Sequence, residues 1–214
     1  MFRKFKIFHF SKLRLEAFSD AVFAIVMTLL VLELKVPYLA NAGDIHEVLE
    51  KIKEVLPVFY SWVVSFFFVG VIWMHHQNIL SMATKSDFGV AWINIFLLFF
   101  ICLLPFPTAL MGEYPRQPLF VMFWGLTVFA TTVCLMWFYY YNTKNYLSDK
   151  YNRESVMKNV QKSAFGVPTL YLAGAFLAWV SVYISFVIYA LIPAIFILPL
   201  DKQDASEAHK DGSI

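Results

Sequence analysis

Long apolar stretches with almost no charged residue dominate this chain of 214 residues. Hydrophobic residues make up 60% of it and charged residues 15%, whereas soluble domains average about 45–50% and about 25%. A helix needs about 20 apolar residues to cross a hydrocarbon core about 30 Å thick. Six segments approach or exceed that length: 15–36, 56–82, 88–111, 119–141, 164–180 and 181–200. The pattern excludes a soluble globular domain and predicts an all-α membrane protein with six transmembrane helices.

Two parts of this pattern are harder to divide into helices. The last two predicted helices share the 37 charge-free residues from Ala164 to Leu200, so each is short and the turn between them is tight. Apolar residues also recur at helical spacing within the charged stretch Tyr38–Glu54. We predict that this stretch forms a separate amphipathic helix outside the membrane.

Basic residues divide unequally between the two ends of the predicted helices. An even number of crossings puts both termini on one side, which then carries 13 Lys and Arg residues against 4 on the other. Because cytoplasmic loops are enriched in basic residues, both termini are predicted to be cytoplasmic and the protein to lie in the plasma membrane. We expect a cytoplasmic segment at 1–13, the membrane domain at 14–200 and a disordered cytoplasmic tail at 201–214. The net charge of +2 is too small to indicate nucleic-acid binding.

The first predicted helix separates its residues by face more sharply than contact with lipid requires. At about 100° per residue, six apolar side chains fall near one line, with Thr28 beside it: Phe18, Val22, Ile25, Leu29, Leu32 and Val36. Asp20 lies on roughly the opposite face, and a carboxylate within a membrane helix is costly unless it faces protein. Spacing alone leaves open whether the apolar line faces lipid, a neighbouring helix or a pore.

The adjacent pair His75-His76 in the second predicted helix is the other polar signal. Neighbouring residues on a helix point about 100° apart, so the two rings do not form the i, i+4 pair typical of a zinc site. We therefore predict no metal site. A buried, hydrogen-bonded histidine is favoured, in a network of Arg14, Ser19, Asp20, Trp73 and His76.

No motif for catalysis or cofactor binding accompanies these residues. Ser19 and Asp20 lack the Gly-x-Ser-x-Gly elbow of a hydrolase, and the chain has no glycine-rich phosphate loop. Cys102 and Cys134 lack metal or redox spacing and are interpreted as small core residues. The sequence therefore indicates neither an enzyme nor a resident cofactor.

Three blocks of sequence together resemble the signature of the transmembrane protein 175 family of potassium channels. The first is Arg14-x-x-x-Phe18-Ser19-Asp20 with the run Ala-x-x-Ala-Ile-x-x-Thr-Leu-x-x-Leu that follows it. The second is His75-His76, and the third is Leu-Leu-Pro-Phe-Pro-Thr at 103–108. The resemblance implies one six-helix repeat per subunit and a homotetramer with a four-fold axis. In that family the first helix lines the pore, and rings of aliphatic side chains constrict it.

The resemblance also implies roles for residues of the first two helices. Ile25, Leu29 and Leu32 would form the constricting rings, with Thr28 as a polar ring near them. A structural network would hold the first helix in place: Arg14, Phe18, Ser19, Asp20, Trp73 and His76. On an ideal helical wheel Arg14 falls on the side of the aliphatic line, so the alternative for Arg14 is a place at the cytoplasmic pore mouth.

The activity that the resemblance implies is passive flux of potassium, with weak selectivity over sodium and no cofactor besides the permeant ion. Two alternatives stay open. Ionisable groups inside membranes often mark proton pathways, so Asp20, His75 and His76 would suit a relay in a proton-permeable or proton-coupled transporter. The other alternative is a membrane scaffold that conducts no ion.

Overall fold

The computed structural model describes the backbone of residues 11–41 and 43–197, with the side chains of 162–165 and 196–197 left aside. The described part folds into seven α-helices and one short 3₁₀ helix. In chain order these are α1 (Lys12–Leu30), η1 (Val31–Glu33), α2 (Ile45–Met82), α3 (Phe88–Leu103), α4 (Pro105–Glu113), α5 (Pro118–Tyr146), α6 (Arg153–Leu177) and α7 (Val182–Ile197). Most of the expected segment 1–13, and all of the expected tail 201–214, lies outside the described residues.

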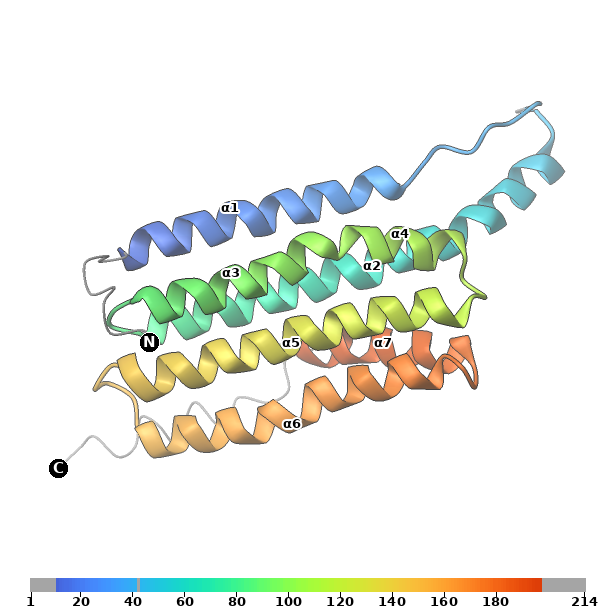
Figure 1. Cartoon of the computed structure of the whole chain (residues 1–214). Helices are drawn as coiled ribbons and strands as arrows, with labels where there is room; N and C mark the ends of the chain where they lie inside the picture. Colours follow the sequence, from blue (N-terminus) through green and yellow to red (C-terminus); the bar gives the residue numbers. More distant parts are fainter. Residues whose placement is uncertain (1–10, 42, 198–214) are drawn as a thin grey trace.

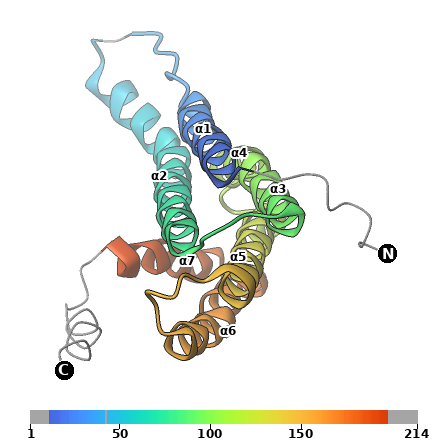
Figure 2. The same ribbon diagram turned by 90° about the vertical axis from the view of Figure 1, so that its left-hand side faces the viewer.

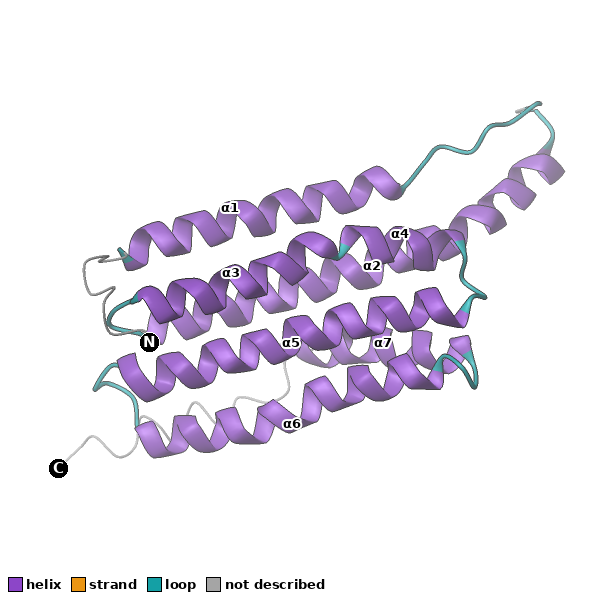
Figure 3. Cartoon of the chain, in the orientation of Figure 1, coloured by secondary structure: helices purple, strands orange, loops and turns teal. Residues whose placement is uncertain are grey.

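The helices lie side by side in one elongated bundle, and the predicted all-α class is confirmed (Figure 1, Figure 3). Seen from its end, the bundle has α1 at its rim, packed against α2 and α3 (Figure 2). Four aromatic side chains meet in the centre, where Phe68, Trp124, Tyr171 and Tyr189 are buried against one another. These rings join α2 and α5 to α6 and α7.

Four helical stretches of the described chain are long and apolar enough to cross a membrane. They are Lys12–Glu33, Ile45–Met82, Phe88–Glu113 and Pro118–Tyr146. α7 is apolar but shorter, and α6 begins with a charged part before its apolar part. The protein is therefore a helical membrane protein, as the sequence predicts.

The predicted external helix at Tyr38–Glu54 is wrong, because the chain continues from Ile45 directly into the second membrane helix. The Asp44 carboxylate caps α2 by accepting a hydrogen bond from the His46 backbone N–H at 2.9 Å. Pro57 removes one helix hydrogen bond, yet α2 continues through it for 38 residues in all. The first turns of α2 project beyond the end of the bundle (Figure 1). An amphipathic pattern thus marked helical residues correctly without marking where the helix ends.

The predicted third helix, 88–111, is interrupted at Leu104 by the sequence that contains Pro105 and Pro107. Proline has no N–H to donate, but it is tolerated in the first turn of a helix, so a new helix begins at Pro105. Leu104 keeps helical dihedral angles, and α3 and α4 together form one apolar stretch. Thr108 ties this region to the core, since its hydroxyl lies 2.8 Å from that of Ser65 on α2.

Other predicted boundaries shift where polar residues begin or end a helix. α6 begins at Arg153, well before the predicted start at Ala164, because the Asn152 side chain caps it. This side chain accepts hydrogen bonds from the N–H groups of Glu154 and Ser155 at 3.0 and 3.3 Å. α1 ends at Leu30, ahead of the predicted end at residue 36, and a turn of 3₁₀ helix follows it. Apolar residues mark the part of a helix that lies inside lipid, whereas capping residues determine where the helix begins and ends.

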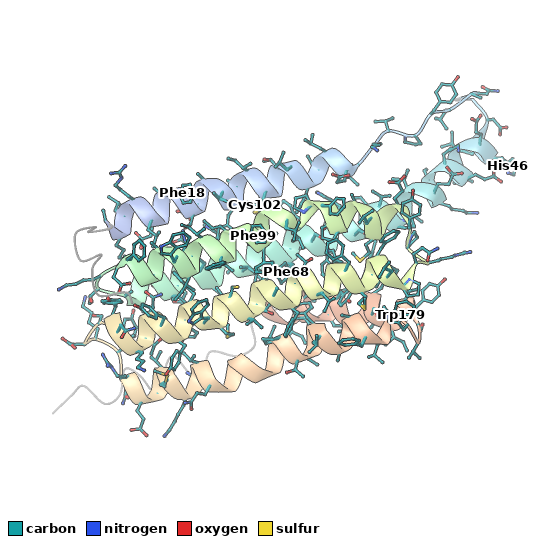
Figure 4. All side chains as sticks on the ribbon, viewed as in Figure 1. Phe18, His46, Phe68, Phe99, Cys102 and Trp179 are labelled. Carbon is teal, nitrogen blue, oxygen red and sulfur yellow. The ribbon has the colours of Figure 1, made fainter. Side chains whose placement is uncertain are left out.

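The interpretation of both cysteines as core residues is wrong for Cys102. Cys102 is exposed on α3, where Figure 4 labels it near Phe99, whereas Cys134 is partly buried. The preference of cysteine for burial does not reveal which face of an apolar helix is covered. In a membrane helix, lipid or another subunit can cover the rest.

Gly125 lets α5 approach α6 and α7 closely. A Cβ added to Gly125 would lie 2.9 Å from Cβ of Ala175 and 2.9 Å from Cζ of Tyr189. We expect Gly125→Ala to lower the free energy of unfolding by about 1–3 kcal/mol, because a buried ring and a packed helix must both shift. The melting temperature of the purified protein in detergent measures the effect. Gly70→Ala is the matched control, since its added Cβ meets only Met27 Cε at 3.9 Å. Equal melting temperatures for the two variants would contradict this packing.

Candidate functional site

The face of α1 that carries the aliphatic line is exposed in the protomer. Ile25 and Leu29 on α1 are 57% and 44% exposed, and Leu32, in the 3₁₀ turn η1 that follows α1, is 68% exposed. Only 28% of the apolar stretch of α1 is buried, against 50% of that of α5. The position of α1 at the rim of the bundle explains the difference (Figure 2). An apolar face this large needs a cover of lipid, protein or a narrow pathway.

Small and hydroxyl-bearing residues share this face with the aliphatic side chains. Ala17, Ala21 and Ala24 are exposed, and small residues allow a second helix to approach closely within a membrane. The exposed Thr28 hydroxyl donates a hydrogen bond to the Ile25 carbonyl at 2.8 Å. The one polar side chain in this part of the face therefore has its donor satisfied within α1.

A buried chain of hydrogen bonds attaches the opposite face of α1 to α3 and α2. The Ser19 hydroxyl donates to the Leu15 carbonyl at 2.9 Å and accepts from Asn94 Nδ2 at 2.9 Å. The Asn94 side-chain carbonyl oxygen accepts a hydrogen bond from the Nε2–H of His76 at 2.8 Å. Ser19, Asn94 and His76 are all fully buried. Because each bond has a defined direction, this chain fixes the rotation of α1.

Aromatic rings enclose His76 on both sides. The Phe138 ring from α5 stacks on it with centroids 5.0 Å apart, and Phe23 of α1 lies 5.5 Å away. The Nδ1 atom of His76 is buried and has no hydrogen-bond partner among the described residues. The ring therefore serves as a donor to Asn94 and as a packing surface between α1 and α5.

A second attachment joins α1 to α2 through the carboxylate of Asp20. The Trp73 indole N–H donates to Oδ1 of Asp20 at 2.8 Å, and the Gln77 side-chain amide donates to the same oxygen. Asp20 thus lies against protein, away from the aliphatic line. A carboxylate in a membrane helix needs such donors, and α2 provides them one helical turn apart.

The first turn of α1 has an attachment of its own. Lys12 Nζ donates to the Ala83 carbonyl, just beyond the end of α2, at 2.9 Å, and lies 3.5 Å from the Glu16 carboxylate. Together with the bonds of Ser19 and Asp20, this contact holds α1 along about half its length. The rotation that exposes Ile25 and Leu29 is therefore set by polar contacts on the other face.

The structure brings together four of the six residues predicted to form the structural network, in two separate clusters. Ser19 and His76 share the buried cluster, and Asp20 and Trp73 share the other. Arg14 and Phe18 lie on the exposed side of α1, where Figure 4 labels Phe18. The described residues offer Arg14 no hydrogen bond or ion pair.

The two adjacent histidines face different surroundings. His75 lines a cavity of about 110 Å³ bounded by residues of α2, α5, α6 and α7, whereas His76 bonds to α3. Within the described residues, no group of three or more His, Cys, Asp or Glu side chains is arranged to hold a metal ion.

Sequence reasoning missed two residues of these clusters, Asn94 and Gln77. Asn94 is the single amide in the apolar segment of α3, and Gln77 follows Trp73 by one helical turn. An isolated amide within a membrane helix is a signal, because it is costly there without a partner. The sequence does not reveal which helix supplies that partner.

Comparisons of sequence and of structure both match this chain to one family of channels. A family model described as endosomal/lysosomal potassium channel TMEM175 matches residues 14–105, which span α1 to α3. A curated protein called a potassium channel, from Chamaesiphon minutus, is 32% identical over 183 residues, covering 80% of this chain and 86% of that protein. A crystal structure described as a lysosomal potassium-selective channel TMEM175 homolog, from the same organism, superposes with a TM-score of 0.75. That match has 27% identity and covers 92% of this chain and 98% of the other.

A vertebrate relative is similar over half of the chain. The chicken protein called endosomal/lysosomal proton channel TMEM175 is 34% identical over 112 residues. The match covers 50% of this chain and 22% of the chicken protein. The similarity is thus to one part of a much longer chain, and that chicken protein is called a proton channel.

Proposed function

The chain belongs to the TMEM175 family of channels, and on that premise we propose that it is a potassium-permeable cation channel whose pore is lined by α1. The observation that carries the proposal is the exposed aliphatic face of α1. Hydrogen bonds on the opposite face of the helix fix the rotation that exposes it. Ile25 and Leu29 on α1, and Leu32 in η1 just after it, are exposed, although the opposite face of α1 is buried and hydrogen-bonded. An ion-channel family is not an enzyme class, so no catalytic step is assigned.

Four copies of α1 around a four-fold axis would turn this face into a pore. Each exposed side chain then becomes a ring, with Ile25, Leu29 and Leu32 as the narrow rings and Thr28 as a polar ring between them. The small side chains of Ala17, Ala21 and Ala24 allow neighbouring helices to pack closely behind the rings. Arg14 lies on the same side of α1, nearer its N-terminus, and would be at the cytoplasmic mouth of the pore.

Aliphatic rings control flux by excluding water. A narrow apolar constriction dewets, and it conducts when the helices separate or rotate enough for a cation and part of its water to pass. Side chains of this kind cannot replace the hydration shell of potassium. Weak selectivity for potassium over sodium follows, because the two ions then differ mainly in hydration and size.

The proposed orientation in the membrane uses all helices of the bundle. α1, α2, the α3–α4 pair, α5, α6 and α7 make six crossings, which puts both termini on the side rich in lysine and arginine. That side is the cytoplasm, and the membrane is the plasma membrane. The subunits form a homotetramer, and the permeant ion is the only ligand.

The oligomer has a direct test in cysteine cross-linking. In a background with Cys102 and Cys134 replaced by alanine, Leu29→Cys is expected to cross-link between subunits, since four copies meet near the axis. Leu170→Cys is the matched control, because Leu170 is similarly exposed, at 51%, but lies on α6. Cross-linked dimers on a denaturing gel, together with a tetramer mass in mild detergent, support the proposal. Cross-linking of Leu170→Cys alone would contradict it.

Proton permeation is the second candidate, because the chicken relative is called a proton channel. The buried Ser19–Asn94–His76 chain and Asp20 lie directly behind the proposed pore. Liposomes loaded with a pH dye and a potassium indicator separate the two functions. Potassium flux without coupled acidification supports the potassium channel, and acidification without potassium flux supports the proton candidate. The absence of both fluxes would favour the non-conducting scaffold.

A further inference from the structure

A groove follows the outer side of the bundle between α2 and α7. Two adjoining hollows make it, with volumes of about 320 and 380 Å³, and Tyr60 lines both. The first hollow is bounded by Pro57, Arg116 and Tyr183 among others. The second hollow continues along α2 to Phe67. Binding pockets for small molecules typically have volumes of about 300–1,000 Å³, so the groove is large enough for a ligand.

The groove has the length of one leaflet of a bilayer. Pro57 and Phe67 are ten residues apart on α2, which at about 1.5 Å per residue is about 15 Å. Half of a hydrocarbon core about 30 Å thick has the same length. A hydrogen bond from the Tyr60 hydroxyl to the Phe186 carbonyl holds α2 and α7 together where the two hollows meet. The apolar segment of α2 begins at Leu56, so a groove of this length that starts at Pro57 reaches about to the middle of the hydrocarbon core.

The two ends of the groove differ in chemistry. The deep hollow is lined by Val63, Val64, Phe67, Ala190, Pro193 and Ala194 besides Tyr60, and the small alanines give it width. The shallow hollow has one charged lining residue, Arg116. Among the described residues Arg116 has no ion pair. A deep apolar end and a shallow cationic end match the two parts of a phospholipid.

Interfacial aromatic residues flank the shallow end. Tyr183 lines the groove there and is 66% exposed. Trp179, in the preceding turn, is exposed at the same end of the bundle and donates a hydrogen bond to Met122 on α5 (Figure 4). Tyrosine and tryptophan are enriched at the level of lipid headgroups. Arg116 is thus at the depth where a lipid phosphate lies, and guanidinium binds phosphate through charge-assisted, bidentate hydrogen bonds.

We propose that this groove binds an anionic phospholipid, with an acyl chain between α2 and α7 and the phosphate group at Arg116. The proposal does not depend on the pore function of α1, which lies elsewhere in the bundle. At this depth the surrounding solvent is hydrocarbon, so an open apolar groove fills with an acyl chain. The charge of Arg116 then selects among lipids by their headgroup.

Titration of the delipidated full-length protein with phosphatidylglycerol, followed by native mass spectrometry, tests the proposal. The wild type is expected to bind phosphatidylglycerol more tightly than phosphatidylcholine. Arg116→Gln is expected to weaken phosphatidylglycerol binding about tenfold, the factor for loss of a charge-assisted hydrogen bond of about 1.4 kcal/mol, and to remove the preference. Lys35→Gln removes a charge at the same end of the bundle but outside the groove, and should leave binding unchanged.

A second pair of variants tests the apolar end without touching a charge. Ala190→Phe fills the deep hollow and should weaken binding, whereas Leu191→Phe changes an exposed neighbour on the same helix and should not. Unchanged binding in both Arg116→Gln and Ala190→Phe would overturn the proposal. Complete displacement of phosphatidylglycerol by inorganic phosphate would also overturn it, because binding would then require only the phosphate site and no acyl-chain groove. Cross-linking of Ala194→Cys between subunits would assign the groove to a second copy of the chain and exclude the lipid.

Discussion

Replacing Ile25 by asparagine is expected to raise potassium flux through the reconstituted protein about tenfold or more. A ring of amides holds water where a ring of isoleucine side chains excludes it, so the dewetting barrier falls. A barrier lower by about 1.4 kcal/mol gives a tenfold faster rate, and hydrating a constriction readily changes the barrier by that much. Potassium efflux from liposomes, normalised to the amount of inserted protein, measures the effect.

The control for this variant is Val31→Asn. Val31 is exposed in η1, the 3₁₀ turn that follows α1, but lies off the line of Ile25, Leu29 and Leu32. The same chemical change there should leave flux near the wild-type value. Ile25→Ala and Leu29→Ala widen the constriction without adding polarity, so both should raise flux less than Ile25→Asn. If potassium flux stays at the wild-type level in Ile25→Asn, Ile25→Ala and Leu29→Ala alike, α1 does not line the ion pathway.

Replacing Asn94 by leucine is expected to lower the free energy of unfolding by about 2–4 kcal/mol. Leucine has nearly the shape of asparagine but removes the acceptor for His76 and the donor to Ser19. Each buried polar group left without a partner costs about 1–3 kcal/mol. For a chain of this size the loss corresponds to a melting temperature lower by roughly 5–15 °C, measured in detergent.

The matched control is Asn145→Leu, because Asn145 is an exposed amide whose Nδ2 donates only to the Tyr141 carbonyl of its own helix. Its melting temperature should change little. Ser19→Ala in combination with Asn94→Leu should cost less than the sum of the two single changes, because one change has already broken the shared bond. Additive costs would show that the cluster does not act as a unit. Loss of the cluster also frees the rotation of α1, so Asn94→Leu should alter flux.

The sequence predicted the membrane helices well where their ends were apolar and poorly where their ends were polar. A count of apolar residues locates the part of a helix that lipid surrounds, but caps such as Asn152 and Asp44 decide where the helix begins. The start of α6 and the early turns of α2 were misjudged for this reason. The break at Leu104 follows from Pro105 and is readable from sequence once both prolines are weighed.

The candidate site was predictable in part for a similar reason. The faces of α1 follow from helical geometry, so the sequence could predict that Ile25 and Asp20 lie on different faces and that Asp20 contacts protein. The partners were not, because they depend on which helices become neighbours. Asn94 lies 75 residues from Ser19 along the chain, and only the packing of α1 against α3 joins them.

We propose that this member of the TMEM175 family conducts potassium passively. Planar-bilayer recording of the purified protein, with potassium on one side and sodium on the other at equal pH, tests it most directly. We expect currents whose reversal potential is shifted modestly in the direction of potassium selectivity. Ile25→Asn should enlarge these currents without changing the proton current. A bilayer that carries no cation current with purified tetramer inserted, or a current that follows only a proton gradient, would contradict it.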